Sequence, residues 1–590
     1  MNIIGINAYF HDSSCALIQD GKLVCAVSEE RFSRFKNDSR LPIRAFRYCL
    51  ETGGISITDV DCIAYYENLE KKIARQLIHN FNQSADDELS WLDYTKPFRE
   101  IREVLGYEGI IKHYDHHLSH AASSYLFSGF EDAAILTNDA VGEWDTSTFG
   151  SAKGQQIDLF ERITYPHSVG LFYSTLTNYL GFKVLNGEYK VMGLAPYGKP
   201  IYADKLRNLY SMPDKFSFEL NMKYFDFGQI NRMYTDNLVD YLGITPRIPE
   251  SKIEQVHKDL ARSLQVVLEE ILIKQVRDLK EKVDTSNLCM SGGVALNCVA
   301  THAIRKAGIF ENIFVQPSAG DSGSALGAAA LAYTELTNQA CEPLKHVYLG
   351  PSYSSQEIAE MLSSLEVDAI DYRNNRDGLN QAVVDRILEN KVIGWFQGRM
   401  EFGPRALGAR SILADSRDEG MRDKLNNLVK KREAFRPFAP AILEEYTHEH
   451  MDFEGASPYM LETCQVESDL YLPAVTHVDG SARIQTVSAE TNPRMHSLIK
   501  CFYERTGCPI LVNTSFNVRG EPIVCTPIDA LRCFGNSGID VLVLEDFFID
   551  RSALSDKFVQ MAERESGVIK PSRDLFSGRP RQAEAIYTFI

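Results

Sequence analysis

The sequence predicts an α/β protein with more than one domain, on three observations. Short apolar runs that end in polar loops alternate with longer amphipathic segments, as strands and helices do in mixed α/β folds. One unit, a strand followed by a polar loop and a hairpin, occurs twice. The length of 590 residues exceeds what one hydrophobic core usually holds and predicts roughly two to four domains.

Composition and charge narrow the class of protein. A hydrophobic content of 44% and a charged content of 24% are ordinary for a globular protein. The net charge of −18 argues against nucleic-acid and membrane partners, because phosphate-rich surfaces require a basic face. The 12 cysteines include no CxxC pair, which indicates a reducing compartment. Without a leader or a long apolar run, we expect a cytoplasmic protein.

The first copy of the repeated unit lies at the N-terminus. An apolar run ends in a polar loop that contains His11 and Asp12, and two further runs flank the hairpin signal Asp20-Gly21. In the second copy, the apolar run of residues 133–137 ends at Asp139 and a second hairpin follows. Two such loops facing each other across a cleft are the plan of the actin-like ATPase and sugar-kinase superfold. Two unrelated hairpins are the plainer alternative.

A predicted helix before the second copy carries a histidine pair. His116 and His120 are four residues apart and share one helical face, whereas His117 lies on another. Asp139, at the mouth of the next strand, is placed to add a carboxylate. Imidazole with carboxylate suits iron, manganese or zinc better than calcium. A helix with a polar histidine face, and no metal, is the alternative.

Two glycine-containing segments follow a predicted amphipathic helix over residues 256–279. A short strand leads into Gly292 and Gly293 and a helix to about Lys306, an arrangement in which backbone N–H groups converge on an anion or nucleotide. No Lys-Ser/Thr pair follows, so this is not a Walker loop. A helix rich in small residues begins at Asp321, which suits a helix N-cap and a metal ligand equally well.

The second part of the chain begins after a turn-rich junction at residues 346–353. From Arg399 to Arg436 ten basic residues stand against six acidic ones. Arginines among glycine, proline and phenylalanine are expected to be partly buried and to need an anion partner, although a solvated helix face is the commoner origin of such an island. A strand that runs into Asn513 and Ser515 would complete a small oxyanion site.

The ordered set of motifs resembles the O-carbamoyltransferases of antibiotic biosynthesis and nodulation. The resemblance runs from residue 3 to about residue 545 and rests on the histidine pair with TNDAVGE, GEYKVMGLAPYG, SGGVALN, GDSGSALGAA, EFGPRALGARSILAD, KKREAFRPFAP and VNTSFNVRGEPIV. It implies an actin-like ATPase-fold (ASKHA) domain over residues 1–347, akin to tRNA threonylcarbamoyltransferases. It also implies a YrdC-like α/β domain over residues 352–590, akin to threonylcarbamoyl-AMP synthases.

The resemblance also implies roles for individual residues. His11 falls beside the acceptor hydroxyl, as general base. The implied ligands of a divalent metal, with Fe(II) favoured, are His116, His120, Asp139 and Asp321. The implied nucleotide residues are Gly187, Gly292, Gly293 and Asn297. The implied carbamoyl phosphate residues are Arg405, Lys430 (or its neighbour Lys431), Arg436, Arg483, Asn513 and Ser515.

The implied activity is ATP-dependent O-carbamoyl transfer. Carbamoyl phosphate and ATP, with Mg²⁺ as an expected companion of ATP, would form carbamoyl-adenylate, which passes its carbamoyl group to a hydroxyl of a natural product or sugar. A homodimer is one option for the oligomeric state. The alternatives are an actin-like-fold metabolite kinase, a non-enzymatic ATP-dependent regulator and a tRNA threonylcarbamoyl-type modifying enzyme, against which the acidic charge weighs.

Overall fold

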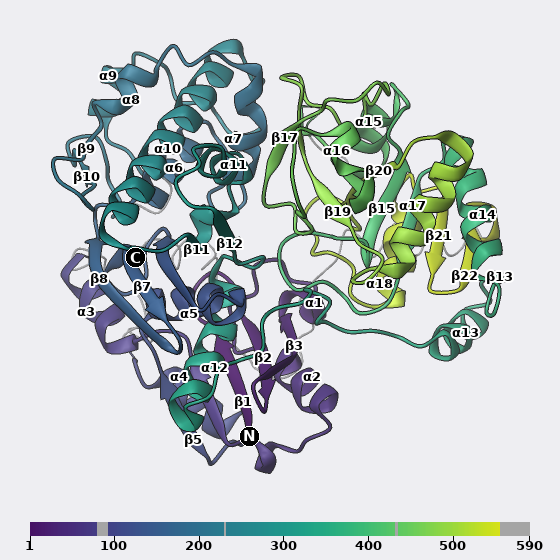
Figure 1. Ribbon diagram of the computed structural model, residues 1–590, viewed down its shortest axis with the longest axis horizontal. Helices are drawn as coiled ribbons and strands as arrows, with labels where there is room; N and C mark the ends of the chain where they lie inside the picture. Colours follow the sequence, from purple (N-terminus) through teal and green to yellow (C-terminus); the bar gives the residue numbers. More distant parts are fainter. Residues whose placement is uncertain (80–92, 229–231, 431–432, 434, 555–590) are drawn as a thin grey trace. The chain divides into compact units, whose positions relative to one another are not determined.

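The computed structural model describes residues 1–79, 93–228, 232–430, 433 and 435–554. The described residues form two compact units. The first contains residues 1–29 and 37–344, and the second contains residues 30–36 and 345–554. Figure 1 follows the chain through both units. No helix of the described ranges is long and apolar enough to cross a membrane.

The first sheet of the first unit has the strand order β3-β2-β1-β4-β5. Strand β1 (Asn2–Asn7) pairs antiparallel with β2 (Ser14–Gln19), which pairs antiparallel with β3 (Lys22–Ser28). On its other side β1 pairs parallel with β4 (Cys62–Tyr65), which pairs parallel with β5 (Ile110–His113). The hairpin expected at Asp20-Gly21 is therefore confirmed.

The second sheet repeats this plan, with the order β12-β11-β6-β7-β8. Strand β6 (Asp132–Asn138) begins an antiparallel run through β7 (Asp145–Lys153) and β8 (Gln156–Thr164). Its other edge pairs parallel with β11 (Asn287–Ser291), and β12 (Asn312–Val315) follows in parallel. Because both sheets share one strand order and one set of directions, the duplication predicted from the sequence is confirmed.

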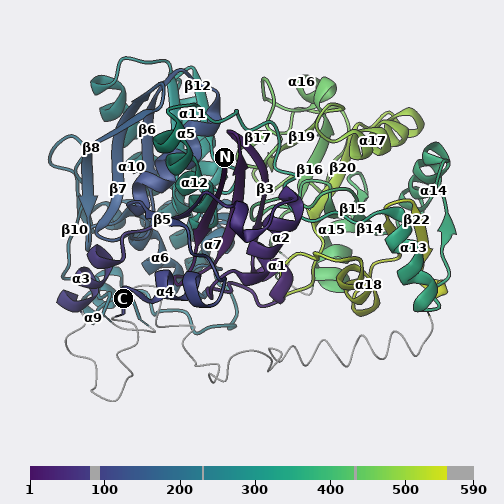
Figure 2. The same ribbon diagram turned by 90° about the horizontal axis from the view of Figure 1, so that it is seen from below.

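Equivalent helices follow the last strand of each sheet. Helix α5 (His116–Ser128) comes after β5, and α12 (Asp321–Thr337) comes after β12. The two helices pack against each other (Figure 2). A Cβ atom at Gly327 would lie 1.8 Å from the carbonyl oxygen of Ser119 on α5, so only glycine allows this approach. The small residues of α12 therefore allow it to pack closely on α5.

The remaining helices of the first unit cover its sheets. Helix α2 (Ile43–Gly53) packs on β2 and β3. The long amphipathic helix predicted for residues 256–279 is present as α10 (Gln255–Lys282), and it contacts α6, α7, α8 and α11. The bounds of the other elements are α3 (Leu69–His79), α4 (Lys96–Glu103), α6 (Val169–Tyr179), α7 (Glu188–Leu194), α8 (Ala203–Arg207), β9 (Tyr210–Ser211), β10 (Glu219–Leu220), α9 (Asp236–Leu242) and α11 (Cys298–Lys306).

The second unit is built on a mixed sheet of the order β13-β22-β21-β14-β15-β20-β16-β19. The strands are β13 (Ile370–Asp371), β14 (Ile393–Phe396), β15 (Arg410–Asp415), β16 (Ala439–Leu443), β19 (Gln485–Val487), β20 (Ile510–Ser515), β21 (Val541–Leu544) and β22 (Phe547–Asp550). Strands β17 (Thr463–Gln465) and β18 (Ser481–Arg483) form a separate pair.

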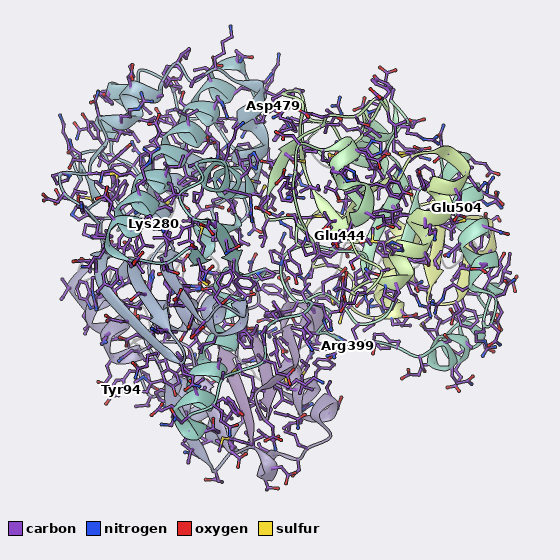
Figure 3. The ribbon with its side chains drawn as sticks, viewed as in Figure 1. Tyr94, Lys280, Arg399, Glu444, Asp479 and Glu504 are labelled. Carbon is purple, nitrogen blue, oxygen red and sulfur yellow. The ribbon has the colours of Figure 1, made fainter. Side chains whose placement is uncertain are left out.

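Helices complete the second unit. They include α13 (Ser355–Ser364), α14 (Arg376–Leu388), α15 (Met421–Lys424), α16 (Thr447–His450), α17 (Pro493–Thr506) and α18 (Pro527–Asn536). Helices α14 and α17 pack on each other, and the apolar side chains of the unit, Trp395 among them, form one large buried cluster. Figure 3 labels Glu504 on α17 and Arg399 in the loop after β14.

A short N-terminal segment belongs to the second unit. Residues 30–36, which include α1 (Glu30–Ser33), lie in that unit although β3 and α2 on either side lie in the first. The Arg34 guanidinium donates to the carbonyl oxygens of Ile523 at 2.6 Å and Pro522 at 2.8 Å. The chain therefore enters the second unit briefly before it completes the first.

Candidate active site

The side chains predicted as metal ligands lie at the ends of elements in the first unit. His116 and His120 share one face of α5, with ring centroids 4.6 Å apart. Asp139 follows β6 directly, and Asp321 is the first residue of α12. All four side chains are buried. The duplicated sheet plan thus brings together groups that are distant in the sequence.

These four side chains converge on one point. The Nε2 atoms of His116 and His120 lie 3.2 and 3.3 Å from Asp139 Oδ2. The same nitrogens lie 3.7 and 3.4 Å from Asp321 Oδ1. One ligand atom of each residue lies within 4.8 Å of the others. Ligand atoms around a tetrahedral metal are themselves roughly 3.3–3.6 Å apart, so small adjustments would place all four around one ion.

The hydrogen bonding of the Asp321 carboxylate gives an independent test of whether these four residues fit a cation. Its side chain is 1% exposed, and among the described residues neither carboxylate oxygen has a hydrogen-bond partner of acceptable geometry. A buried carboxylate in this condition is costly unless a positive charge neutralises it. Two imidazoles and two carboxylates are a donor set that iron, manganese and zinc accept. The residues therefore fit a divalent transition metal.

Surrounding groups hold the ligands in orientation. The Nδ1 atom of His120 lies 3.3 Å from the hydroxyl oxygens of both Ser291 and Ser324. Gly293 donates its backbone N–H to Asp139 Oδ1 at 3.2 Å. Contacts of this kind fix the tautomer and the ring orientation of metal-binding histidines.

Two further buried side chains are His117, in the first turn of α5, and Glu143, in the loop after β6. His117 is turned away from the cluster, with Nδ1 2.6 Å from a threonine hydroxyl on β6, in agreement with its predicted face. Glu143 accepts the backbone N–H of His116 at 2.9 Å, and burial raises the pKa of Glu143 to about 7. Sequence reasoning missed Glu143, although its position in the loop after Asp139 was an available signal.

The cluster attracts positive charge. Burial by itself would lower the pKa of His120, but the carboxylates of Asp139 and Asp321 outweigh it and raise that pKa to about 9. Burial would raise the pKa of both carboxyls, but the neighbouring imidazoles hold them well below their usual range. Both carboxylates therefore stay ionised, and protons or a cation have to balance them.

His11, the predicted general base, lies at the edge of this cluster. Its Nε2 atom is 3.1 Å from Asp321 Oδ2, and its Nδ1 atom is 3.8 Å from Asp12 Oδ2. Burial would lower the pKa of His11, but the carboxylates of Asp321 and Asp12 outweigh burial and raise it to about 10. Sequence reasoning did not single out Asp12 as a site residue; its place beside His11 was the signal.

The predicted nucleotide residues fall at two places. Gly292 has a φ of 90°, and a Cβ atom there would lie 2.2 Å from the carbonyl oxygen of Asn138, so the glycine pair lies directly beside the end of β6. Asn297 caps α11 by accepting a backbone N–H of its first turn at 3.1 Å. Gly187 directly precedes α7, and the sulfur of Met192 in that helix lies 3.7 Å from the sulfur of Cys298, the first residue of α11.

In the second unit, the structure joins two of the predicted carbamoyl phosphate residues. The Lys430 ammonium donates to the Ser515 hydroxyl at 3.1 Å and to Asn517 Oδ1 at 2.8 Å. Lys430 is buried, at 4% exposure. Its alternative, Lys431, lies outside the described residues.

Asn513 lies two residues before Ser515 on β20 and connects two other segments. Its side-chain amide donates to the carbonyl oxygen of Ala406 at 3.2 Å and to Gln485 Oε1 at 2.6 Å. Arg405 precedes the first of these partners, and Arg483 lies two residues before the second at the end of β18. Arg436 lies before β16, with its guanidinium 3.9 Å from the Glu433 carboxylate.

Two family models match the chain. The carbamoyltransferase N-terminus matches residues 2–330, and the carbamoyltransferase C-terminus matches residues 384–551. The chain belongs to the carbamoyltransferase family. All the site residues discussed above lie within the two matched regions. The chain is therefore an enzyme of the carbamoyltransferase type.

The chain is similar to three relatives over more than nine tenths of its length. An uncharacterized protein of Synechocystis is 42% identical over 94% of this chain and 97% of its own length. The nodulation protein NolNO of Sinorhizobium fredii is 37% identical over 93% of this chain and 80% of its own. The 3'-hydroxymethylcephem-O-carbamoyltransferase of Amycolatopsis lactamdurans is 29% identical over 92% of this chain and 98% of its own.

Proposed function

We propose that this carbamoyltransferase transfers a carbamoyl group from carbamoyl phosphate, through carbamoyl-adenylate, to a hydroxyl of a small natural product or sugar. Hydrolysis of carbamoyl phosphate releases phosphate and carbamate. A carbamate oxygen then attacks the α-phosphorus of ATP, and pyrophosphate leaves. The acceptor oxygen attacks the carbamoyl carbon, AMP leaves, and the acceptor's proton passes to a base.

The observation that carries the proposal is the cluster of His116, His120, Asp139 and Asp321 beside the glycine pair Gly292–Gly293. A divalent ion held there, Fe(II) by preference, would anchor phosphate oxygens and polarise the carbamoyl carbonyl. The backbone N–H of Gly293 donates to Asp139 Oδ1, and that of Gly292 donates to the Ala319 carbonyl oxygen at 2.9 Å. The glycine pair supports the nucleotide assignment because residues without side chains allow a phosphate to approach the backbone closely. We assign Gly187 and Asn297 to the same nucleotide site.

His11 is proposed to take the proton of the acceptor hydroxyl. The side chain is 17% exposed, so an acceptor can reach it from solvent. A base must be neutral, and the carboxylates of Asp321 and Asp12 oppose this by raising its pKa. Neutralisation of Asp321 by a cation would remove the larger of these two influences, so the proposed base and the proposed ligands depend on each other.

The second unit is proposed to form the adenylate, as a YrdC-like domain over residues 352–590 that complements a transferase domain over residues 1–347. Carbamoyl phosphate is an anion that charge-assisted donors recognise. Lys430 supplies an ammonium beside the Ser515 hydroxyl. Asn513 supplies its amide oxygen, which has no hydrogen-bond partner among the described residues. The assigned guanidinium groups are those of Arg405, Arg436 and Arg483.

One assay tests the reaction. The full-length enzyme is incubated with ATP and Fe(II), with and without carbamoyl phosphate, and carbamoyl-adenylate, AMP, ADP and pyrophosphate are quantified by chromatography. We expect pyrophosphate in an amount equal to the sum of carbamoyl-adenylate and the AMP formed by its hydrolysis, and only when carbamoyl phosphate is present. Formation of ADP would instead indicate a kinase, and AMP with pyrophosphate in the presence of threonine and bicarbonate alone would indicate a threonylcarbamoyl enzyme.

A further inference from the structure

The two oxygens of Asp321 face different groups. Oδ1 lies toward the Nε2 atoms of His116 and His120, at 3.7 and 3.4 Å. Oδ2 lies 3.1 Å from the Nε2 atom of His11, in an approach that lacks the alignment of a hydrogen bond. A carboxylate that offers one oxygen to each side is the arrangement that bridges the ions of two-metal sites, which lie about 3.5–4 Å apart.

A second group of ligand-type atoms lies on the Oδ2 side. One atom each from His11, Asp12 and Asp321 lies within 4.8 Å of the other two. Asp12 is already held in place, because its Oδ1 accepts the side-chain amide of Asn7 at 2.9 Å. Its other oxygen, Oδ2, lies toward His11. One imidazole and two carboxylates leave coordination positions open for water or substrate, as in catalytic rather than structural sites.

We infer that His11, Asp12 and Asp321 form a second divalent-cation site, in which the Asp321 carboxylate bridges to the ion held by His116, His120 and Asp139. The inference rests on the proposed function for the first of these two ions. The chemistry of the second group, one imidazole nitrogen and two carboxylate oxygens, suits Mn²⁺, Fe²⁺ or Zn²⁺.

The two sites differ in access to solvent. The ligand side chains of the first site are between 0% and 9% exposed, whereas those of His11 and Asp12 are 17% and 19% exposed. The second site also has fewer protein ligands. We therefore expect the second ion to bind more weakly and to exchange faster than the first.

Occupation of the second site has a chemical consequence. An ion bound to the Nε2 atom of His11 uses the lone pair that would otherwise accept a proton from the acceptor hydroxyl. Carbamoyl transfer should therefore rise as the first ion binds and fall as the second one does. Formation of carbamoyl-adenylate with release of pyrophosphate, assigned to the second unit, should not fall with it.

The number of metal ions bound per chain tests the second cation site without reference to activity. Metal-free full-length enzyme is dialysed against increasing free Mn²⁺, bound Mn²⁺ is measured by elemental analysis, and electron paramagnetic resonance spectra are recorded. The wild-type enzyme should pass from one to two ions per chain, and the spectrum should change from that of an isolated ion to that of an exchange-coupled pair. Binding that stops at one ion up to millimolar Mn²⁺ would overturn the inference.

Two variants locate the second ion. Asp12→Asn keeps an oxygen that can accept the Asn7 amide but loses the charge, and His11→Asn removes the imidazole. Each should weaken binding of the second ion more than about tenfold and leave the first ion bound, which also reports that the variant is folded. Asp204→Asn, at an exposed carboxylate paired with Arg207, is the matched control and should bind two ions.

The outcomes separate the inference from the proposed function. Two ions that remain exchange-coupled in both variants would place the second ion elsewhere and overturn the inference. Two ions in the wild type and one in each variant would support it even if AMP and pyrophosphate failed to form, a result that would instead overturn the proposed reaction.

Discussion

At the scale of single residues, the chemistry of the first unit depends on how buried charges are balanced. Asp139 and Asp321 are buried carboxylates, and the imidazoles of His116 and His120 lie between them. Burial penalises each of these charges by itself, so the four groups are stable only as a set or with an ion. Replacement of one ligand should therefore weaken metal binding in the first unit. The second unit should stay folded, because none of the four ligands belongs to it.

The first prediction concerns His120. His120→Ala removes one of the two imidazole ligands, so bound metal and carbamoyl transfer should both fall at least tenfold, while carbamoyl phosphate-dependent release of pyrophosphate stays near the wild-type rate. Elemental analysis and the pyrophosphate assay measure the two effects. His496→Ala, at a histidine 2.9 Å from Glu445 in the second unit, is the control. Full metal occupancy in His120→Ala would remove His120 from the site.

The second prediction concerns Arg436. Arg436→Ala should weaken carbamoyl phosphate binding by about 1.5–3 kcal/mol, the contribution of a hydrogen bond to a charged group. Pyrophosphate release at subsaturating carbamoyl phosphate should fall about 10- to 150-fold, with normal metal content. Arg417→Ala, in the same basic segment but paired with Asp415 at 2.7 Å, should behave as wild type. Equal rates for the two variants would show that Arg436 does not contact the substrate.

At the scale of elements, the N-terminus of α2 is capped by a side chain that follows β3. The residue that precedes α2, Pro42, provides no side-chain cap. Glu29, directly after β3, supplies it by accepting the backbone N–H groups of Arg44 at 3.0 Å and Ala45 at 2.8 Å. Burial raises the pKa of Glu29 from 4.5 to about 7. The cap is therefore protonated over a range in which an exposed carboxyl would be ionised.

The third prediction follows from this pKa. Because the folded state binds the Glu29 proton more tightly than the unfolded state, its contribution to stability is full below about pH 4.5 and is lost as the pH rises to about 7. The loss amounts to roughly 3 kcal/mol at most. In Glu29→Gln, which keeps one acceptor and does not titrate, thermal unfolding of the first unit should vary less between pH 5 and pH 8. An unchanged pH dependence would contradict the prediction.

At the scale of the whole molecule, each unit contains segments that are separated in the sequence. Residues 30–36 belong to the second unit, although most of that unit begins only at residue 345. Arg34 holds residues 30–36 in the second unit. It donates to two backbone carbonyl oxygens, and its guanidinium lies 3.5 Å from the Asp529 carboxylate. A substitution near the N-terminus should therefore affect a region about five hundred residues later in the sequence.

The fourth prediction tests this attachment. Arg34→Ala leaves two carbonyl groups without their charged donor and should destabilise their surroundings by about 1.5–3 kcal/mol. Hydrogen exchange of α18 and the segment before it should become at least tenfold faster, and exchange of β1 should not change. Arg40→Ala, at an exposed arginine paired with Asp38, is the control. Exchange at wild-type rates in α18 would show that Arg34 does not hold the segment.

In the basic segment of residues 399–436, the sequence predicted that arginine side chains are buried but not which groups their guanidinium groups contact. We expected buried arginines there to face anions. Arg410 is fully buried, but its guanidinium donates to the backbone carbonyl oxygens of Gln397, Gly398 and Pro351 and lies 3.5 Å from the ring centroid of Phe396. Carbonyl groups from neighbouring loops hold this guanidinium. Burial lowers its pKa, and the carboxylates of Glu401 and Glu545 oppose that effect.

The sequence by itself determined the duplicated sheet plan, the shared face of His116 and His120, and the strand end at Asp139. These features follow from local periodicity, since helical and strand repeats decide which residues lie together on an element. The order of motifs also indicated the family. The local sequence left the role of Asp321 open, and the resemblance implied that it is a ligand. Only the tertiary structure shows how near Asp321 lies to the histidines, that His11 and Asp12 approach its second oxygen, and that Arg34 belongs to the second unit. Each of these contacts joins residues distant in the chain, and the packing of helices on sheets, which no local pattern encodes, sets their distances.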